Sequence, residues 1–157
     1  MTSLPNLITL GRILALPLFL ALLYFAPPVW AAGCFLILAL SDAVDGILAR
    51  YLGEVTDLGK ILDPLADKVI VVSALIALID LRGIPALPVI LIVARDLLVS
   101  AGRTHGASIW GKIKTVFQVI AVLMLILNWP YALLVLWFAV FLSLISGVDY
   151  FVGSTGS

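Results

Sequence analysis

Four aspartates lie close together in an otherwise strongly apolar part of the sequence. Asp42 and Asp45 are three residues apart, and Asp63 and Asp67 are four residues apart. At these spacings the two members of each pair project from one face of a helix. An unpaired carboxylate in hydrocarbon costs on the order of 3 kcal/mol, so four of them require cations as partners. The fold must therefore place cations next to these carboxylates.

The segment between the two pairs predicts two antiparallel helices. A polar turn over residues 51–57 separates a helix that ends near Arg50 from one that begins near Leu58. At a rise of about 1.5 Å per residue, the inner aspartate of each pair lies roughly 8 Å from this turn, and the outer ones roughly 12 and 14 Å from it. We therefore expect the two pairs to meet at matching depth and form one acidic cluster.

Clustered carboxylate oxygens suit hard divalent cations such as Mg²⁺ or Mn²⁺, and two such ions would lie about 4 Å apart. Small residues on or next to the same helix faces would leave room for a bulky ligand; these are Gly46, Ala49 and Gly59. Arg50 can hold a phosphate with two parallel hydrogen bonds. The alternative is purely structural: Arg50, Lys60 and Lys68 would only neutralise the aspartates.

These residue types and spacings resemble the signature of the CDP-alcohol phosphatidyltransferase family. All eight signature positions match, namely Asp42, Asp45, Gly46, Ala49, Arg50, Gly59, Asp63 and Asp67. The resemblance implies a metal-dependent transferase in which all four aspartates bind the ions, with Asp42, Asp45 and Asp63 as the main ligands and Asp67 also as the general base. It also implies a homodimer.

Composition points to a membrane protein independently of the resemblance. Of the 157 residues, 64% are hydrophobic and only 11% are charged. A soluble domain of this size could not bury that much apolar surface, because a large part of any small domain stays exposed. Nine basic and nine acidic residues give no net charge, so nothing favours nucleic-acid binding. Membrane lipids are the expected surroundings.

The expected fold class is all-α: a polytopic membrane protein with six transmembrane helices and a short N-terminal interfacial helix in roughly the first dozen residues. Apolar runs separated by proline, glycine and polar turns place the spans at 13–26, 29–50, 58–79, 86–103, 111–127 and 131–146. We expect one domain over residues 1–152 and a flexible tail over 153–157.

Six spans place both termini on the same side of the membrane. With that side inside, every lysine and arginine except Arg82 falls in the inner half or inner loops. The positive-inside rule then places the acidic cluster at the cytoplasmic face of a bacterial-type cell membrane.

A second polar group lies in the second half of the chain. Asp96, Ser100 and Arg103 share one face of the fourth predicted helix, with Arg95 to the side. The expected cationic rim, at the depth of the acidic cluster, comprises Arg95, Arg103, Lys112 and Lys114. Such a rim suits a phosphate monoester, or alternatively anionic lipid headgroups. We expect Asp96 to orient Arg95 or Arg103 rather than to bind metal.

Further motifs resemble the phosphatidylglycerophosphate synthase branch of the family. They are Pro5-Asn-Leu-Ile-Thr9 with Arg12, Arg95-Asp-Leu-Leu-Val-Ser-Ala-Gly-Arg103, and Gly111-Lys-Ile-Lys-Thr115. This resemblance implies transfer of the phosphatidyl group of CDP-diacylglycerol to glycerol 3-phosphate, with release of CMP. It places the donor near Asn6, Thr9, Gly46, Ala49, Arg50 and Gly59, and the acceptor phosphate at the cationic rim.

Two alternatives stay open. One is the same chemistry with inositol phosphate or serine as the acceptor. The other is a divalent-cation transporter, for which paired intramembrane carboxylates are also typical. A transporter site is expected near the midplane of the membrane, whereas these aspartates lie toward one face, close to arginine and lysine.

Overall fold

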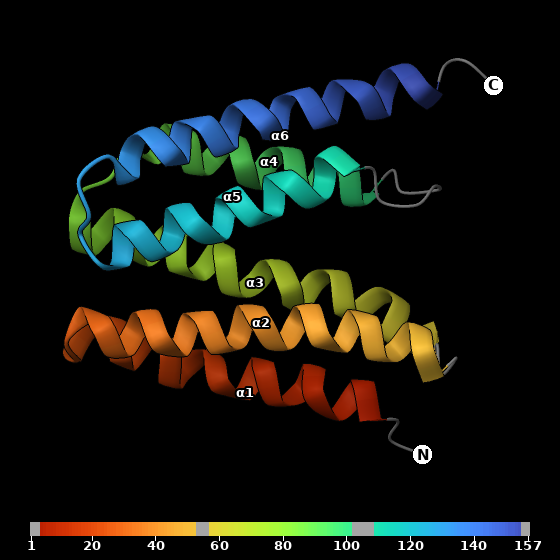
Figure 1. Ribbon diagram of the computed structural model, residues 1–157, viewed down its shortest axis with the longest axis horizontal. Helices are drawn as coiled ribbons and strands as arrows, with labels where there is room; N and C mark the ends of the chain where they lie inside the picture. The colour runs from red at the N-terminus through yellow and green to blue at the C-terminus, as the bar shows by residue number, and fades with distance from the viewer. Residues whose placement is uncertain (1–3, 53–56, 102–108, 155–157) are drawn as a thin grey trace. The chain divides into compact units, whose positions relative to one another are not determined.

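The structure, a computed structural model, describes the backbone of residues 4–52, 57–101 and 109–154, and the side chains of residues 10–41, 68–99 and 113–148. Within these ranges the chain forms six helices and no strand, so the all-α prediction is confirmed there (Figure 1). The helices are α1 (Leu4–Phe25), α2 (Pro28–Leu52), α3 (Asp57–Arg82), α4 (Ala86–Ala101), α5 (Ile109–Ile126) and α6 (Ala132–Ser154).

The helix boundaries differ from the prediction mainly at the two ends of the chain. The expected short interfacial helix is not a separate element, because α1 runs without a break from Leu4 to Phe25. Pro5 lies in the first turn of α1, where a missing backbone N–H is tolerated, and no proline separates this turn from the apolar run. At the other end, α6 continues to Ser154, since no proline follows residue 146.

The chain divides into two compact units, Met1–Ala77 and Leu78–Ser157, and the boundary falls inside α3. In the first unit, α1 and α2 pack against each other as antiparallel neighbours on either side of Pro27 (Figure 1). Phe19 of α1 and Phe35 of α2 are fully buried, with ring centroids 5.8 Å apart and planes tilted by 40°. Offset aromatic contacts of this kind add to the stabilisation from apolar burial.

In the second unit, α6 packs against both α5 and α4. It runs antiparallel to α5 and parallel to α4 (Figure 1). Phe117 of α5 and Phe138 of α6 meet edge to face, with ring centroids 5.0 Å apart. Val122 and Leu136 of the same two helices are fully buried. This packing holds three helices together around the polar side chains described below.

Two helix ends in the second unit are fixed by residues in the left-handed region. Gly83 has a φ of 62° and ends α3, a conformation that glycine adopts without steric cost. At the end of α5, Asn128 has a φ of 55°. The Trp129 N–H donates to the Met124 carbonyl at 2.8 Å and the Asn128 N–H to the Leu125 carbonyl at 3.2 Å, which is the Schellman arrangement. Both turns thus satisfy carbonyls that a helix end would leave open.

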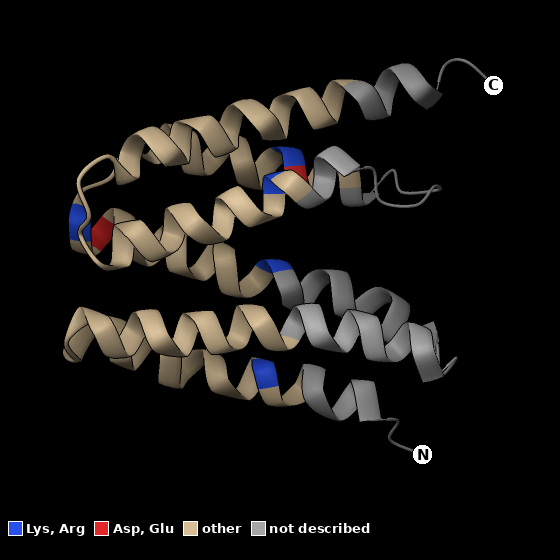
Figure 2. Cartoon of the chain, viewed as in Figure 1, with Lys and Arg blue, Asp and Glu red and all other residues tan. Residues whose placement is uncertain are grey.

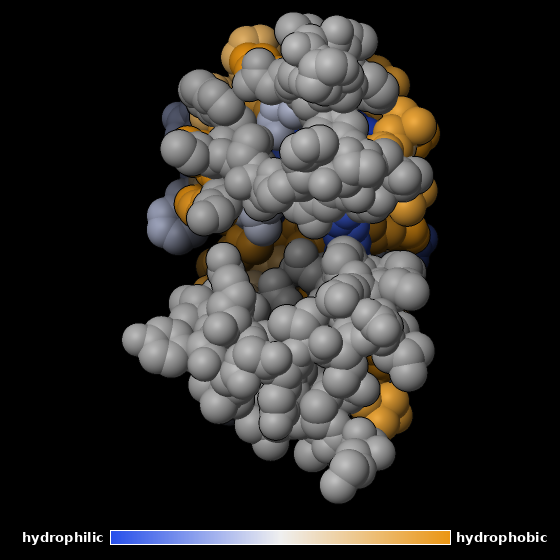
Figure 3. All heavy atoms as spheres, turned by 90° about the vertical axis from the view of Figure 1, so that its right-hand side faces the viewer, coloured by the Kyte–Doolittle hydropathy of each residue, from blue (hydrophilic) through white to orange (hydrophobic). Residues whose placement is uncertain are grey.

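The described helices carry few charges, as Figure 2 shows. Many of their large apolar side chains are exposed. Phe25 is 90% exposed, Leu14 and Ile37 are each 69% exposed, and Leu98 is 63% exposed. Hydrophobic residues also reach the surface on the face shown in Figure 3. Within the stretches whose side chains are described, no helix combines the length and the apolar character needed to cross a membrane.

Candidate functional site

The eight signature positions fall on two consecutive helices of the first unit. Those on α2 are Asp42, Asp45, Gly46, Ala49 and Arg50, and those on α3 are Gly59, Asp63 and Asp67. The predicted helix-turn-helix arrangement of the two aspartate pairs therefore agrees with the helix assignment. The side chains at these positions lie outside the described residues, so the expected acidic cluster stays a prediction.

The remaining predicted site residues are distributed over three helices and one connection. Asn6 and Thr9 lie on α1, Arg95 on α4, and Lys112 and Lys114 on α5. Arg103 lies in the stretch between α4 and α5, outside the described residues, as do the side chains of Asn6, Thr9 and Lys112. Among the side chains that are described, no group of three potential metal ligands occurs.

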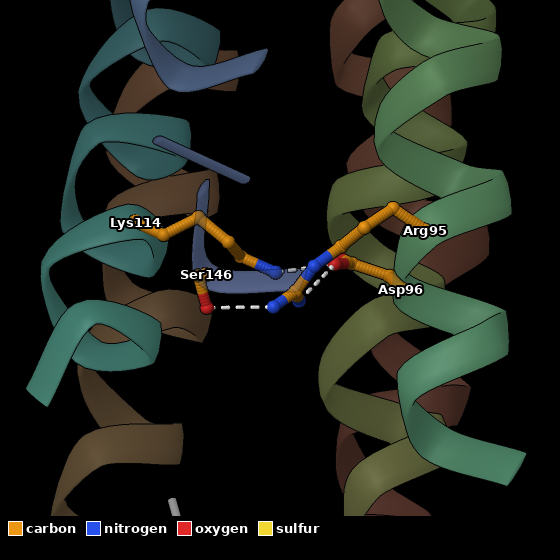
Figure 4. A network of polar contacts seen from close by, with 4 residues as sticks. All are labelled: Arg95, Asp96, Lys114 and Ser146. Carbon is orange, nitrogen blue, oxygen red and sulfur yellow. Dashed lines mark hydrogen bonds and ion pairs between the residues drawn. The ribbon is translucent and has the colours of Figure 1, made fainter. Parts of the chain in front are cut away.

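Arg95 and Lys114 meet at a shared carboxylate in the second unit (Figure 4). The Arg95 guanidinium donates to Oδ1 of Asp96 at 3.0 Å, and the Lys114 ammonium donates to the same oxygen. This acceptor joins α4 to α5. The expectation that Asp96 orients a neighbouring arginine is thus confirmed for Arg95.

The third helix of the unit contributes a hydroxyl to the same group. Ser146 of α6 accepts a hydrogen bond from the other terminal nitrogen of Arg95 at 2.6 Å (Figure 4). We call Arg95, Asp96, Lys114 and Ser146 the polar network. It connects α4, α5 and α6 at one level, through side chains that point toward one another from three helices.

The polar network is almost completely shielded from solvent. The side chains of Arg95, Asp96 and Lys114 are 12%, 10% and 6% exposed. At this burial, ionic hydrogen bonds are much stronger than on a surface, and removing one partner is correspondingly costly. Two cations from two helices thus share one carboxylate oxygen, Oδ1 of Asp96.

Further hydrogen-bonding groups are buried one turn away from the network. Gln118 follows Lys114 by four residues on α5, and Ser143 precedes Ser146 by three on α6, so each shares a face with its network neighbour. Both residues are buried. Within the described residues, Nε2 of Gln118, the Ser143 hydroxyl and Nε of Arg95 have no hydrogen-bond partner.

Sequence reasoning missed the contribution of α6 to this site. Ser143 and Ser146 interrupt a long apolar run of α6 at a spacing of three, and this was the available signal. The spacing indicates a shared face but does not identify a partner far away in the sequence. Ser146 and Arg95 are 51 residues apart in the sequence, and their contact follows from the packing of α6 against α4.

Comparison with known proteins gives a consistent assignment over nearly the whole chain. The sequence profile of the CDP-alcohol phosphatidyltransferases matches residues 2–145. The chain belongs to this family. A CDP-diacylglycerol–glycerol-3-phosphate 3-phosphatidyltransferase of Bacillus subtilis (strain 168) is 40% identical over 96% of this chain and 94% of its own length.

Two other relatives of this phosphatidyltransferase have closely related names. A protein of Rickettsia bellii (strain RML369-C) with the same name as the Bacillus protein is 36% identical over 95% of this chain and 93% of its own length. A probable phosphatidylglycerophosphate synthase of Mycobacterium tuberculosis (strain ATCC 25618 / H37Rv) is 36% identical over 94% of this chain and 79% of its own length. The resemblance inferred from the signature is thereby confirmed.

Proposed function

We propose that this phosphatidyltransferase moves the phosphatidyl group of CDP-diacylglycerol to glycerol 3-phosphate, giving phosphatidylglycerophosphate and CMP in phospholipid biosynthesis. The observation that carries the proposal is the near full-length match to relatives with this activity in their names, of which the Bacillus protein is 40% identical. The complete eight-residue signature on α2 and α3 supports the same chemistry.

The donor set of the signature fits two divalent cations, Mg²⁺ or Mn²⁺. Four carboxylates from consecutive helices supply the hard oxygen ligands that these ions prefer, and we assign Asp42, Asp45, Asp63 and Asp67 to them. When bound, the ions supply positive charge that neutralises the pyrophosphate oxygens and stabilises departing CMP. The proposed enzyme is therefore metal-dependent.

The protein's own residues position the donor and move the proton. Arg50 binds a donor phosphate, and Gly46, Ala49 and Gly59 leave room for the cytidine; Asn6 and Thr9 of α1 complete the donor site. Asp67 accepts the proton of the primary hydroxyl of glycerol 3-phosphate. The hydroxyl oxygen then bonds to the phosphatidyl phosphorus as the bond to the CMP oxygen breaks.

The acceptor phosphate is recognised by cations of the second half of the chain. The residues assigned to it are Arg95, Arg103, Lys112 and Lys114. The contact of Arg95 and Lys114 with one carboxylate supports this assignment, because it brings two of these cations together from α4 and α5, and charged donors of this kind bind phosphate well. A serine or an unphosphorylated alcohol would not use these cations, which favours a phosphorylated acceptor such as glycerol 3-phosphate.

The protein acts in a bacterial-type cell membrane as a polytopic protein, with the signature at the cytoplasmic face and the lipid tails of the donor in the bilayer. This part of the proposal rests on the 64% hydrophobic composition and on the positive-inside distribution of lysine and arginine. Exposed apolar side chains on the described helices agree with lipid surroundings. The assembly proposed from the family resemblance is a homodimer.

The decisive test is an assay of the purified protein with CDP-diacylglycerol, Mg²⁺ or Mn²⁺, and a panel of acceptors. Glycerol 3-phosphate, inositol phosphate and serine are compared by CMP release and by identification of the lipid product. We expect glycerol 3-phosphate to be the preferred acceptor and to exceed serine by roughly a hundredfold or more, because a site that binds a phosphate rejects an acceptor that lacks one. A lipid product containing inositol phosphate or serine instead would overturn the assignment of the acceptor.

A further inference from the structure

Arg95 lies directly against the backbone of α6. Its terminal nitrogen donates to Ser146 at 2.6 Å. At the next residue, Gly147, an added Cβ would lie 3.5 Å from Nε and 3.6 Å from Cγ of Arg95. The Ser146 hydroxyl thus lies next to the backbone of Gly147, which has no side chain, and the Arg95 side chain packs against both.

The contact with α6 is transmitted through Arg95 to the rest of the polar network. The second terminal nitrogen of Arg95 donates to Oδ1 of Asp96 at 3.0 Å, and the same oxygen binds Lys114 (Figure 4). Because one oxygen serves both cations, a shift of the guanidinium changes the position available to the ammonium. The contact of Arg95 with Ser146 and Gly147 on α6 therefore also affects Lys114, which lies on a different helix, α5.

We propose that Ser146 and Gly147 are positioning residues for acceptor binding: they hold Arg95 in the one arrangement that keeps Asp96 and Lys114 in place for the acceptor phosphate. This inference rests on the proposed function. Nothing in the signature or in the names of the relatives points to α6, and neither residue is among those assigned to the donor.

The position of the polar network along the helices explains why we expect Ser146 and Gly147 to affect the affinity for the acceptor. Lys112 precedes Lys114 by two residues, and Arg103 follows the last residue of α4, Ala101, by two. By joining α4, α5 and α6 near these ends, the network holds the end of α4 and the start of α5, next to which the other two proposed acceptor cations lie in the sequence. When the network is loosened, the cations occupy several arrangements. Binding of the phosphate must then order them, and this cost lowers the affinity for the acceptor.

The first test compares two serines of α6. Ser146→Ala removes the acceptor for Arg95, whereas Ser143→Ala removes a buried hydroxyl of the same helix that has no hydrogen-bond partner within the described residues. We expect Ser146→Ala to raise the KM for glycerol 3-phosphate roughly three- to tenfold, with kcat and the KM for CDP-diacylglycerol changed less than about twofold. Ser143→Ala should resemble the wild type, and Ser146→Thr, which keeps the hydroxyl, should recover most of the loss.

The second test varies size at position 147. A Cβ at this position makes ordinary van der Waals contact with Arg95, so Gly147→Ala should have a much smaller effect than Gly147→Val, whose γ carbons extend farther toward the guanidinium. Gly147→Val is expected to raise the KM for glycerol 3-phosphate as Ser146→Ala does. If Ser146→Ala does not yield folded protein, Ser146→Cys replaces it, since the thiol keeps the size and is a weaker acceptor.

The outcomes separate this inference from the proposed function. If the wild-type enzyme uses glycerol 3-phosphate but Ser146→Ala and Ser143→Ala give the same KM for it, the positioning role is wrong. The role is also wrong if Ser146→Ala changes the KM of both substrates and the thermal stability together, because that pattern indicates general loosening. Wild-type protein that releases CMP only with another acceptor contradicts the proposed function instead, and the same variants are then compared with that acceptor.

Discussion

Lys114 of α5 and Asp96 of α4 form a buried ion pair that joins two helices of the second unit. The carboxylate oxygen of this pair is also the acceptor for Arg95. Asp96 therefore pairs with two largely buried cations through one oxygen. Removing either cation leaves the other ion pair intact, whereas removing the Asp96 carboxylate breaks both.

This difference between Asp96 and the two cations predicts which of two variants is less stable. Asp96→Asn should lower the free energy of unfolding by about 3–5 kcal/mol, the usual effect of breaking a buried ion pair, because both pairs lose their carboxylate. Lys114→Met should cost less, because the Arg95 and Asp96 pair persists and methionine fills a similar volume. Thermal unfolding in detergent measures both, and equal losses for the two variants would contradict the shared-carboxylate account.

A second stability prediction concerns the end of α5. A terminal nitrogen of Arg82 donates to the carbonyl of Ile126, the last residue of α5, at 3.1 Å. Arg82→Met keeps the apolar stem but removes this bond, so we expect a loss of about 1 kcal/mol, or roughly 2–4 °C in Tm. CMP release per folded molecule should not change. An altered KM for either substrate would mean that this end of α5 has a role beyond stability.

Sequence patterns predicted the helices well because their breakers are local. Pro27 and Pro28, Gly83 and Pro85, and Asn128 to Pro130 all separate helices where they were expected to. The predicted start of the first span, at residue 13, was wrong. Polar residues before an apolar run do not by themselves end a helix, and α1 begins at Leu4. A helix boundary follows from dihedral preferences of nearby residues, which the sequence contains directly.

The candidate site was predictable only where its residues share a helix. The spacing of Asp42 and Asp45, or of Asp63 and Asp67, defines a common face without tertiary information. The bond between Arg95 and Ser146 could not be anticipated in this way, because it depends on how α4 and α6 pack. The sequence also did not indicate that Arg95 and Lys114 of the predicted rim meet at Asp96, largely shielded from solvent, because this contact depends on the packing of α4 and α5.

Metal dependence gives the third prediction. Without cations the four signature carboxylates repel one another, so chelation with EDTA should abolish CMP release and Mg²⁺ or Mn²⁺ should restore it. Asp42→Asn, Asp45→Asn and Asp63→Asn should each lower kcat by at least about a hundredfold without loss of folded protein in detergent. Asp80→Asn, on α3 but outside the signature, is the matched control. Full activity of a signature variant at low Mg²⁺ would remove that aspartate from the proposed ligand set.

The fourth prediction places the signature on the cytoplasmic side. In a Cys34→Ser background, which removes the only cysteine, single cysteines are introduced as Glu54→Cys between α2 and α3 and as Leu81→Cys near the end of α3. A membrane-impermeant thiol reagent added to intact cells should label the second and not the first. In inverted vesicles the pattern should reverse. Labelling of Glu54→Cys from outside the cell would place the acidic cluster away from cytosolic glycerol 3-phosphate.

The fifth prediction separates acceptor from donor recognition. If Arg103 holds the acceptor phosphate, Arg103→Gln removes a charge-assisted hydrogen bond, on the order of 2 kcal/mol, and should raise the KM for glycerol 3-phosphate roughly tenfold or more. Arg103→Lys should recover only part of this loss, because lysine is a point donor and arginine a planar fork.

Arg50→Gln is the matched comparison for this prediction, since Arg50 belongs to the signature and is assigned to the donor. It should raise the KM for CDP-diacylglycerol and leave the glycerol 3-phosphate dependence nearly unchanged. Apparent KM values for both substrates, measured for all three variants, decide the assignment. An Arg103→Gln enzyme that loses affinity only for the nucleotide donor would show that the phosphate pocket has been assigned to the wrong residues, and the choice of glycerol 3-phosphate would then lose its structural support.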